Sequence, residues 1–435
     1  MSAGGEPGSA APARAPAQAI SGGYAGYVLA LLTLVYVVSF IDRQILAMLI
    51  EPIKREFGVS DTAMGLLTGF AFVLFYTLAG IPIARLADRA SRKGIITLSL
   101  AAWSVMTAAS GLVRSFAQLA TIRVFVGVGE AGCNPSAHSL ISDYFPPQRR
   151  ATALSVYACG VFIGSAIAFL AGGWLLTRYD WRTAFFVAGL PGLLLAILVG
   201  LTVRELPRGH AEGRAGAVAP APLREVVRFL LARRAFVLIV IGTAIQSLSG
   251  YAVINWGPAF LARVYGMSWS EIGAGLGWVI GIGGTFGALA GGRLADYMGR
   301  RDARWYMRLP ALQCLLAVPF VVGFTILEEP SLALVSFIPF YTLTAMYVGP
   351  MFAMVQGLVE LRMRATAAAI MLFITNMVGL GLGPLVVGLL NDHVFGAVYG
   401  VAGIRYSLLT VGLLGGTSSV FFWAASRRLR DELLT

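Results

Sequence analysis

Twelve apolar stretches, each long enough to cross a bilayer, dominate this sequence of 435 residues. A hydrocarbon core about 30 Å thick needs about 20 mainly apolar residues per helix. Only 12% of the residues are charged, about half the share found in soluble domains. The sequence therefore predicts an all-helical membrane protein and excludes a soluble enzyme. The predicted spans are 24–50, 61–84, 94–113, 116–142, 150–176, 182–203, 234–262, 271–292, 305–327, 331–359, 365–390 and 402–425.

Basic residues lie mainly on one side of the predicted membrane. Twelve crossings put both termini on one side, where tails and loops carry 24 of the 33 Lys and Arg residues, against seven in the opposite loops. Loops rich in Lys and Arg stay in the cytoplasm. We therefore expect cytoplasmic termini in a bacterial inner membrane. Because the charge of +12 lies in loops between apolar runs, it does not indicate a nucleic-acid partner.

The longest predicted loop divides the chain into two halves. Residues 204–233 are rich in Pro, Ala and Gly at their centre, which is typical of a flexible linker. This linker separates an amino-terminal six-helix bundle at 24–203 from a carboxyl-terminal bundle at 234–426. We expect residues 1–23 to form a disordered cytoplasmic tail and 427–435 a short cytoplasmic tail.

Two pairs of short sequences repeat between these halves. ARLADRASRK at 84–93 is echoed by GRLADYMGRR at 292–301, and Arg-Ala-Thr at 150–152 by Arg-Ala-Thr at 364–366. Both pairs align each predicted helix of the first half with the helix that comes six helices later in the chain. The halves are therefore predicted to be pseudo-symmetric bundles. Parallel repeats of this kind are a transporter architecture, with the site between the halves near the midplane.

The repeated loops resemble the signature of the major facilitator superfamily, glycine-x-x-x-Asp-Arg-x-glycine-Arg-Lys. The copy at 292–301 is the better match, whereas the copy at 84–93 keeps the charged residues but lacks the two glycines. Residues 123–131, Arg-x-x-x-Gly-x-Gly-x-Ala, are similar to the superfamily's motif in its fourth helix. The resemblance covers the chain from about residue 24 and implies alternating access by two rocking bundles.

A narrower resemblance is to the spinster branch, whose members move lysophospholipids and sphingolipids. Asp42-Arg43, the run Arg123-x-x-x-Gly-Val-Gly-Glu-Ala and the stretch from Asp143 to Arg150 followed by Ala-Thr-Ala-Leu-Ser carry it. This resemblance implies a lipid-like amphiphile as substrate.

Four formal charges lie inside the predicted spans: Asp42, Arg43, Arg123 and Glu130. Each costs at least about 2.5–3.5 kcal/mol at the centre of a helix on the insertion scale. Asp42 and Arg123 fall at similar depths, about 10–12 Å below the outer surface, so a salt bridge between them is possible. Glu130 lies two turns deeper on the face of Arg123, which makes this line a candidate proton path. The alternative is a static ion pair, and Arg43 is expected to reach the outer interface.

Polar but uncharged residues mark the midplane of the carboxyl-terminal half. Hydrogen bonds between helices explain such residues equally well. A site with one charged and one neutral wall suits an amphiphile, although a small carboxylate would fit too. The predicted substrate-binding residues of the two halves are Arg43, Arg123, Glu130, Gln246, Asn255, Tyr347 and Asn376.

The charged repeat loops have two interpretations. They serve as topology signals, or, as the resemblance implies, they hold the cytoplasmic ends of the two halves together in the outward-facing state. The predicted gating residues are Asp88, Arg89, Arg92, Lys93, Asp296, Arg300 and Arg301.

No sequence pattern implies a cofactor or a metal. GVGEAG at 127–132 has the spacing of a dinucleotide fingerprint but lies in an apolar span with no strand before it. No phosphate-binding loop is present, so ATP is not the predicted energy source. We therefore predict a monomeric, proton-coupled secondary transporter for a lipid-like amphiphile, with a proton-coupled permease for small organic anions as the alternative.

Overall fold

The computed structural model describes residues 21–87, 90–207 and 221–433, and its regular elements there are all helical. In this part of the chain nine helical stretches are long and apolar enough to span a membrane. The last of them, 366–429, contains two crossings, and the helices at 92–110 and 116–144 supply two more. The predicted twelve-helix membrane fold is therefore confirmed.

The amino-terminal half makes six crossings, and short interruptions divide three of them. Its elements are α1 (Gly22–Phe57); α2 (Asp61–Gly65), the π-helix η1 (Leu66–Phe70) and α3 (Ala71–Ala87); α4 (Arg92–Ser110); α5 (Phe116–Glu130) and α6 (Cys133–Tyr144); α7 (Pro147–Ala158) and α8 (Gly160–Arg178); and α9 (Trp181–Thr202).

The carboxyl-terminal half repeats this plan. Its elements are α11 (Arg234–Tyr265); α12 (Trp269–Trp278), the π-helix η2 (Val279–Gly283) and α13 (Gly284–Gly299); α14 (Trp305–Ile326); α15 (Pro330–Ala345) and α16 (Val348–Gly357); η3 (Leu361–Met363), α17 (Arg364–Thr375), the π-helix η4 (Asn376–Leu382) and α18 (Gly383–Leu390); the π-helix η5 (Asn391–Phe395), α19 (Gly396–Tyr399) and η6 (Gly400–Ala402); and α20 (Gly403–Glu432).

Part of the predicted flexible linker is helical. Residues 223–232, within the segment 204–233, form α10 (Leu223–Ala232). Val226 and Leu230, four residues apart on one face of α10, are buried against the carboxyl-terminal half. An apolar face with helical spacing stabilises a short helix once it has a surface to pack against. The expectation of a flexible segment is therefore wrong for these ten residues, while 208–220 lie outside the described part of the chain.

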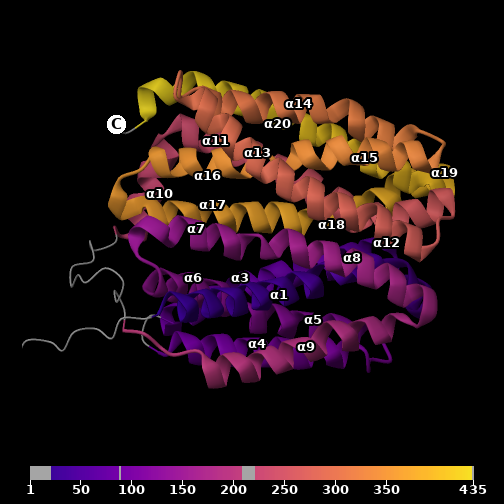
Figure 1. The fold of residues 1–435 in the computed structure, drawn as a ribbon. Coiled ribbons are helices and arrows are strands. Elements are labelled where there is room, and N and C mark those ends of the chain that lie inside the picture. Colours follow the sequence, from indigo (N-terminus) through magenta and orange to yellow (C-terminus); the bar gives the residue numbers. More distant parts are fainter. Residues whose placement is uncertain (1–20, 88–89, 208–220, 434–435) are drawn as a thin grey trace, which may run out of the picture.

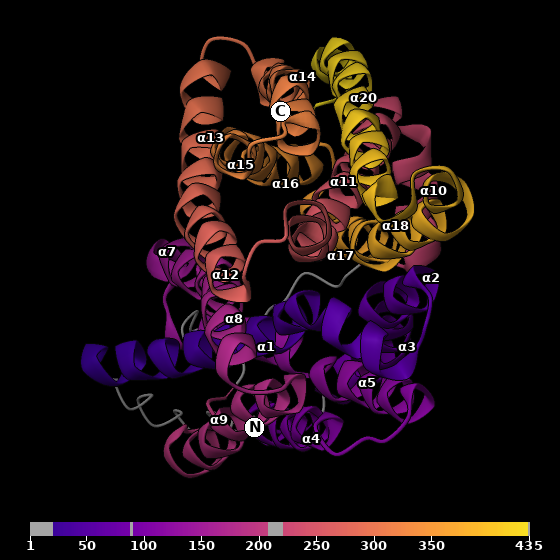
Figure 2. The same ribbon diagram turned by 90° about the vertical axis from the view of Figure 1, so that its right-hand side faces the viewer.

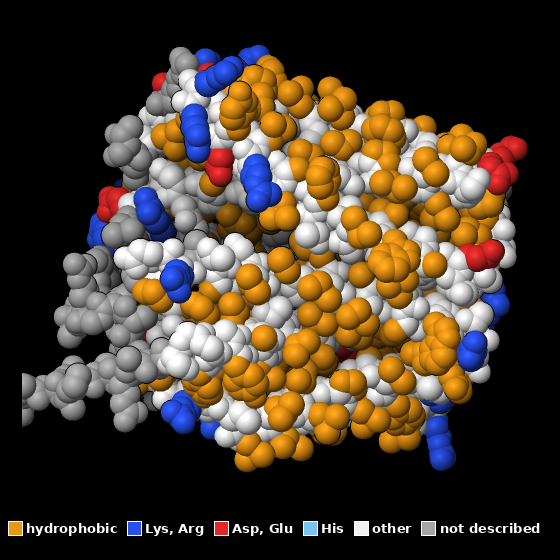
Figure 3. All heavy atoms as spheres, viewed as in Figure 1, with side chains coloured by type: hydrophobic (Ala, Val, Ile, Leu, Met, Phe, Trp, Pro, Cys, Tyr) orange, Lys and Arg blue, Asp and Glu red, His pale blue; other side chains and the backbone are white. Residues whose placement is uncertain are grey.

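Both ends of the described chain lie on one side of the bundle, which we call the terminal side, at the left of Figure 1. Figure 2 looks onto the opposite, far side. Packing between the halves joins α8 to α12, α2 to α18 and α1 to α11. Seen from the side, the surface is hollowed between the halves toward the terminal side (Figure 3).

Glycines bring the two halves into backbone contact near the far side. A Cβ on Gly273 of α12 would lie 2.5 Å from the carbonyl oxygen of Phe169 in α8. A Cβ on Gly65 of α2 would lie 2.5 Å from the carbonyl oxygen of Pro384 in α18. Small residues permit such approach between membrane helices. The far-side contact therefore depends on these glycines.

Replacing Gly273 with valine should separate the halves at the far side, because its side chain would overlap backbone atoms of α8 and only a shift of the two helices apart relieves the overlap. Alkylation of a cysteine placed at Thr62 should become faster than in the same cysteine variant with Gly273 intact. Gly257→Ala is the matched control, since its Cβ would meet only a Leu276 side-chain carbon at 3.6 Å. Equal labelling rates in both variants would contradict the account.

Candidate functional site

The first buried ion pair joins α1 to α5. Arg123 donates from Nη1 to both carboxylate oxygens of Asp42, over 3.0 and 3.1 Å. Thr107 of α4 donates its hydroxyl to the same carboxylate over 2.7 Å. Both charged side chains are buried. The pairing expected from depth is thus present, and it ties three helices together.

The second buried ion pair joins Arg43 of α1 to Glu130, the last residue of α5. Arg43 donates from Nε to Glu130 Oε2 over 2.6 Å, and Nη2 lies 2.6 Å from the same oxygen. Ser39 donates to that oxygen over 3.3 Å. The Glu130 side chain is 1% exposed and that of Arg43 14%. Within the described structure, Glu130 Oε1 has no hydrogen-bond partner.

One expectation from the sequence about these charges is wrong. Arg43 does not extend to the outer interface but pairs with Glu130. The physical reason is the direction of side chains, which lean toward the amino terminus of their helix. Since α1 begins on the terminal side, Arg43 leans back into the membrane, where it reaches Glu130.

Aromatic rings surround the guanidinium of Arg43. Its Cζ lies 5.4 Å from the ring centroid of Phe40, 5.1 Å from that of Phe72 and 4.8 Å from that of Tyr76. Phe72 also lies 5.8 Å from Cζ of Arg123, so one ring contacts both cations. Cation–π contacts gain strength when they are desolvated. These rings gave no distinct signal in a sequence with 25 phenylalanines and 15 tyrosines.

A second aromatic group lies between this site and the carboxyl-terminal half. Tyr36 of α1 stacks on Tyr157 of α7 at 4.4 Å, and the Tyr157 hydroxyl lies 2.9 Å from Oδ1 of Asn134. Tyr251 of α11 and Met377 of η4 pack against the same apolar cluster from the other half. The charged site therefore borders the interface between the halves.

The predicted polar wall of the carboxyl-terminal half is largely absent. Gln246 lines a small cavity inside that half, with Cys314 beside it. Asn255 is buried and donates to the Tyr251 carbonyl of its own helix over 3.0 Å. Tyr347 is buried in the core, near Phe422.

Asn376 is the exception among the predicted polar residues, because it is half-buried and begins η4, the π-helical segment that meets the amino-terminal half. Helical spacing could not predict which of these polar residues lie inside the half and which reach the interface, because a polar residue in a span faces a neighbouring helix as readily as a cavity.

Helix interruptions coincide with the site. Helix α5 ends at Glu130, and a turn at Ala131 and Gly132 precedes α6. The π-helices η1 and η4 face one another across the halves. Interrupted helices in transporters mark binding sites at the interface of repeats, and π-bulges are frequent at functional sites.

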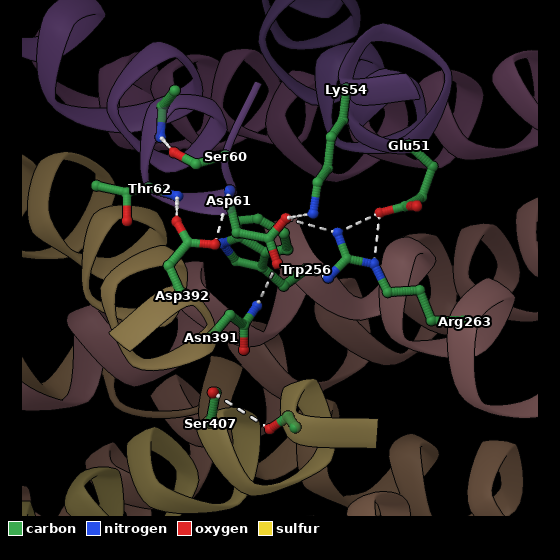
Figure 4. Close-up of polar contacts among 12 residues, drawn as sticks. Glu51, Lys54, Ser60, Asp61, Thr62, Trp256, Arg263, Asn391, Asp392 and Ser407 are labelled. Atoms are coloured by element: carbon green, nitrogen blue, oxygen red, sulfur yellow. Dashed lines mark hydrogen bonds and ion pairs between the residues drawn. The ribbon is translucent and has the colours of Figure 1, made fainter. Parts of the chain in front are cut away.

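A separate ionic network joins the two halves at the far side, and its contacts are drawn in Figure 4. Arg263 of α11 donates to Glu51 of α1 over 2.6 Å and to both oxygens of Asp61 in α2 over 2.5 and 2.7 Å. Lys54 also pairs with Asp61. Both carboxylates are buried. This network therefore ties α11 of one half to α1 and α2 of the other.

The start of η5 completes the far-side network. Asp392 accepts hydrogen bonds from the Asp61 and Thr62 N–H groups over 3.2 and 2.7 Å, and Asn391 donates to the Asp61 carboxylate over 3.0 Å. Asp392 thus caps α2 from the opposite half. Lys54 and Arg263 fall in loops between predicted spans, where a charge indicates topology, so this network was not predicted from the sequence. The signal available in the sequence was the mixture of acidic and basic residues, Glu51, Lys54, Asp61 and Arg263, at the ends of predicted spans on this side.

The predicted gating residues of the amino-terminal loop lie partly outside the described residues, because Asp88 and Arg89 are not described. Arg92 contacts its own half: it pairs with Asp143, donates to Glu205 over 2.9 Å and to the Leu206 carbonyl over 2.6 Å.

Glu205 is held by several donors at the same place. Partial burial raises the pKa of its carboxyl, but hydrogen bonds from the Lys93 N–H, Arg92 and Ser91 keep that pKa below its ordinary value. In this conformation the cluster joins helix ends within one half.

The gating residues of the other half also contact their own bundle. Asp296 accepts a hydrogen bond from Tyr306 over 2.8 Å, and the guanidinium of Arg301 lies 5.6 Å from the Tyr297 ring. Asp296, Arg300 and Arg301 are exposed on the terminal side. Their predicted role concerns a conformation closed on that side, so it stays a prediction.

Comparison with known proteins places these features in a family. The family described as Major Facilitator Superfamily matches residues 32–384. An MFS-type efflux pump of Mycolicibacterium smegmatis is 36% identical over 409 residues, or 93% of each chain. The cis,cis-muconate transport protein of Acinetobacter baylyi is 30% identical over 276 residues, or 60% of this chain and 63% of its own.

A solved structure extends the similarity to the whole fold. The crystal structure of a bacterial homolog to the human lysosomal transporter spinster, in an inward-facing and unoccupied conformation, is 31% identical. It matches with a TM-score of 0.84, over 96% of this chain and 100% of its own. The resemblance inferred from the sequence motifs is therefore confirmed.

Removing Arg43 should destabilise the protein, because it leaves the Glu130 carboxylate buried without a cation. Breaking a buried pair from one side costs about 3–5 kcal/mol. Arg43→Ala should therefore lower the thermal unfolding temperature in micelles, and Glu130→Gln added to it should restore part of the loss. Arg114→Ala, at an exposed position, is the control. An Arg43→Ala effect as small as that of the control would refute the pairing.

Removing Arg263 should open the far side, because Arg263 is the cation that the carboxyl-terminal half supplies to Glu51 and Asp61. The ion pairs that remain, Lys54 with Asp61 and Arg55 with Glu51, lie within the amino-terminal half. Hydrogen–deuterium exchange in α2 should increase in Arg263→Ala. Arg178→Ala removes an exposed arginine from the same side and should leave that exchange unchanged. Unaltered exchange in Arg263→Ala would show that the network does not hold the halves together.

Proposed function

Because this chain belongs to the major facilitator superfamily and is a secondary transporter, we propose that it couples transport of a lipid-like amphiphile to a proton gradient. The observation that carries the proposal is the Arg43–Glu130 pair, which is buried at the interface between the halves. Intramembrane ionisable residues are costly and are functional by default.

Glu130 is the proposed proton carrier. Its Oε2 atom accepts the hydrogen bonds from Ser39 and Arg43, while Oε1 is buried with no partner among the described residues. While Arg43 is in contact, the carboxylate is stable as an anion. When helix movement withdraws Arg43, an unpaired carboxylate in an apolar site is too costly, so it takes up a proton. Proton uptake and conformation are then coupled.

Asp42 and Arg123 have a supporting role in this proposal. Arg123 satisfies both oxygens of Asp42, and Thr107 adds a third hydrogen bond. That pair holds α5 against α1 while Arg43 moves. The Phe72 ring contacts the guanidinium groups of both Arg43 and Arg123. A movement of one ion pair would therefore displace this ring and disturb the other pair.

We assign the described conformation to the inward-facing state. The ionic network and the glycine contacts close the far side, and the basic terminal side is assigned to the cytoplasm by its charge. Reopening of the far side would require Arg263 to leave Glu51 and Asp61. Closure of the terminal side would then bring the Asp88 and Asp296 loops together.

An amphiphile suits the surroundings of Arg43. Its polar head would contact the guanidinium and Asn376, and its chain would lie against aromatic rings such as Tyr76 and Tyr251. The similarity to a spinster homolog supports a lipid-like substrate. The M. smegmatis relative, described as an efflux pump, supports export.

A proton-coupled permease for small organic anions is the second candidate. One partly exposed guanidinium framed by aromatic rings would also bind a conjugated dicarboxylate. The muconate transport protein of A. baylyi is a relative whose name states such a substrate.

Proteoliposome uptake under an imposed pH gradient tests the proposal. Wild-type protein should move a labelled lysophospholipid, and Glu130→Gln should abolish the dependence on the gradient because the side chain cannot exchange a proton. Glu328→Gln neutralises an exposed carboxylate and should behave as wild type. Lipid movement that depends neither on the pH gradient nor on the Glu130→Gln substitution would show that Glu130 does not couple transport to protons. Gradient-driven uptake of muconate without lipid movement would favour the second candidate.

A further inference from the structure

A groove of about 910 Å³ opens on the outer surface of the carboxyl-terminal half, away from the interface between the halves. It lies between the beginning of α11, the first half of α14 and the end of α20. Its walls are apolar, and four of its side chains, Leu312, Leu315, Val420 and Trp423, are exposed there. A membrane-spanning bundle presents such a surface to lipid tails.

Three arginines stand at the terminal-side end of this groove. Arg234 is the first residue of α11, and Arg427 and Arg428 belong to the last two turns of α20. On α20 the groove residues run from Val420 to Arg428 along one face. At 1.5 Å per residue, the apolar wall extends about 10 Å beyond the arginines into the membrane.

These arginines lack anionic partners. Within the part of the chain that the structure describes, the side chains of Arg234, Arg427 and Arg428 form no ion pair and no hydrogen bond. Their neighbour Arg233, by contrast, donates to the Glu432 carbonyl. On the same side, Arg92 and Arg362 each pair with acidic residues. The groove therefore gathers three guanidinium groups that no ion pair within the described residues occupies. On the face seen in Figure 3, basic side chains gather at this end of the half.

Tryptophan side chains place the arginines at the level of lipid headgroups. Trp423 lines the groove, and its ring lies 5.7 Å from the guanidinium carbon of Arg308. That guanidinium also lies 5.8 Å from the Trp305 ring. Tryptophan is enriched where the bilayer core meets the headgroups. The mouth of the groove is therefore at the membrane surface and its apolar wall is within the bilayer.

We propose that this groove is a binding site for an anionic phospholipid of the surrounding bilayer. The phosphate contacts Arg234, Arg427 and Arg428, and one acyl chain lies along Leu315 and Val420. Basic pockets between membrane helices on the cytoplasmic side recognise anionic headgroups in this way. The groove opens toward the lipid, so the ligand enters sideways from the membrane. This lipid is separate from the transported substrate, and the site does not depend on the proposed function.

Native mass spectrometry of the full-length protein in detergent tests the site. The probes are phosphatidylglycerol and phosphatidylcholine with identical acyl chains. Phosphatidylglycerol should bind at least tenfold more tightly to wild type, and Arg427→Ala/Arg428→Ala should remove that preference. Arg149→Ala/Arg204→Ala removes two exposed arginines from the same side of the other half and should leave the preference intact. Ala424→Trp should fill the groove and weaken binding without changing the charge.

The outcomes separate the possible sources of affinity. Soluble glycerol 3-phosphate should not displace the lipid if the apolar wall contributes as proposed. Equal binding of the two lipids to wild type would overturn the proposal, as would an unchanged preference in Arg427→Ala/Arg428→Ala. An equal loss in the Arg149→Ala/Arg204→Ala control would assign the preference to overall charge rather than to the groove. Thermal unfolding of each variant checks that it is folded.

Discussion

Four formal charges inside one six-helix bundle are the constraint on which the rest of this structure depends. A bilayer cannot hydrate them, so each must find a partner within the protein. The sequence supplies two carboxylates and two guanidinium groups on α1 and α5, and the structure pairs Asp42 with Arg123 and Arg43 with Glu130. The two pairs differ in completeness. Every carboxylate oxygen of Asp42 is satisfied, whereas Glu130 keeps one buried oxygen that has no partner among the described residues. For this reason we propose the second pair, not the first, as the site of proton exchange.

The two halves are similar in fold but differ in the residues that they place at the interface. The amino-terminal half holds the charged centre, while the carboxyl-terminal half buries Gln246, Asn255 and Tyr347 within itself. Beside the charged centre, the second half contributes Tyr251 of α11 and the π-helix η4, which contains Met377. Two kinds of contact join the halves at the far side: glycines that leave no room for a Cβ against the opposite helix, and Arg263, which bridges two buried carboxylates. Such contacts have two discrete arrangements, made or broken, which suits a protein that alternates between two states.

The membrane spans, the division into halves and the Asp42–Arg123 pair could be predicted because they follow from hydropathy, charge placement and depth along a helix. Arg43 was placed wrongly because depth alone ignores the lean of helical side chains toward the amino terminus. The far-side network was missed because Arg263 and Asp61 lie at predicted span ends, where a charge reads as a topology signal. Helix α10 was missed although Val226 and Leu230 have helical spacing, because a helix of ten residues is marginal until its apolar face packs against the second half.

We propose that the Arg43–Glu130 pair decides which side of the protein is open. The most direct measurement is the distribution of distances between spin labels on the terminal side, one at Arg149 and one at Tyr297, in a chain whose three cysteines are replaced by serine. Glu130→Gln, which mimics the protonated acid, should shift the population away from the described conformation and shorten this distance. The same shift should appear in the parent chain as the pH falls. An identical distribution in both chains at every pH would contradict the account.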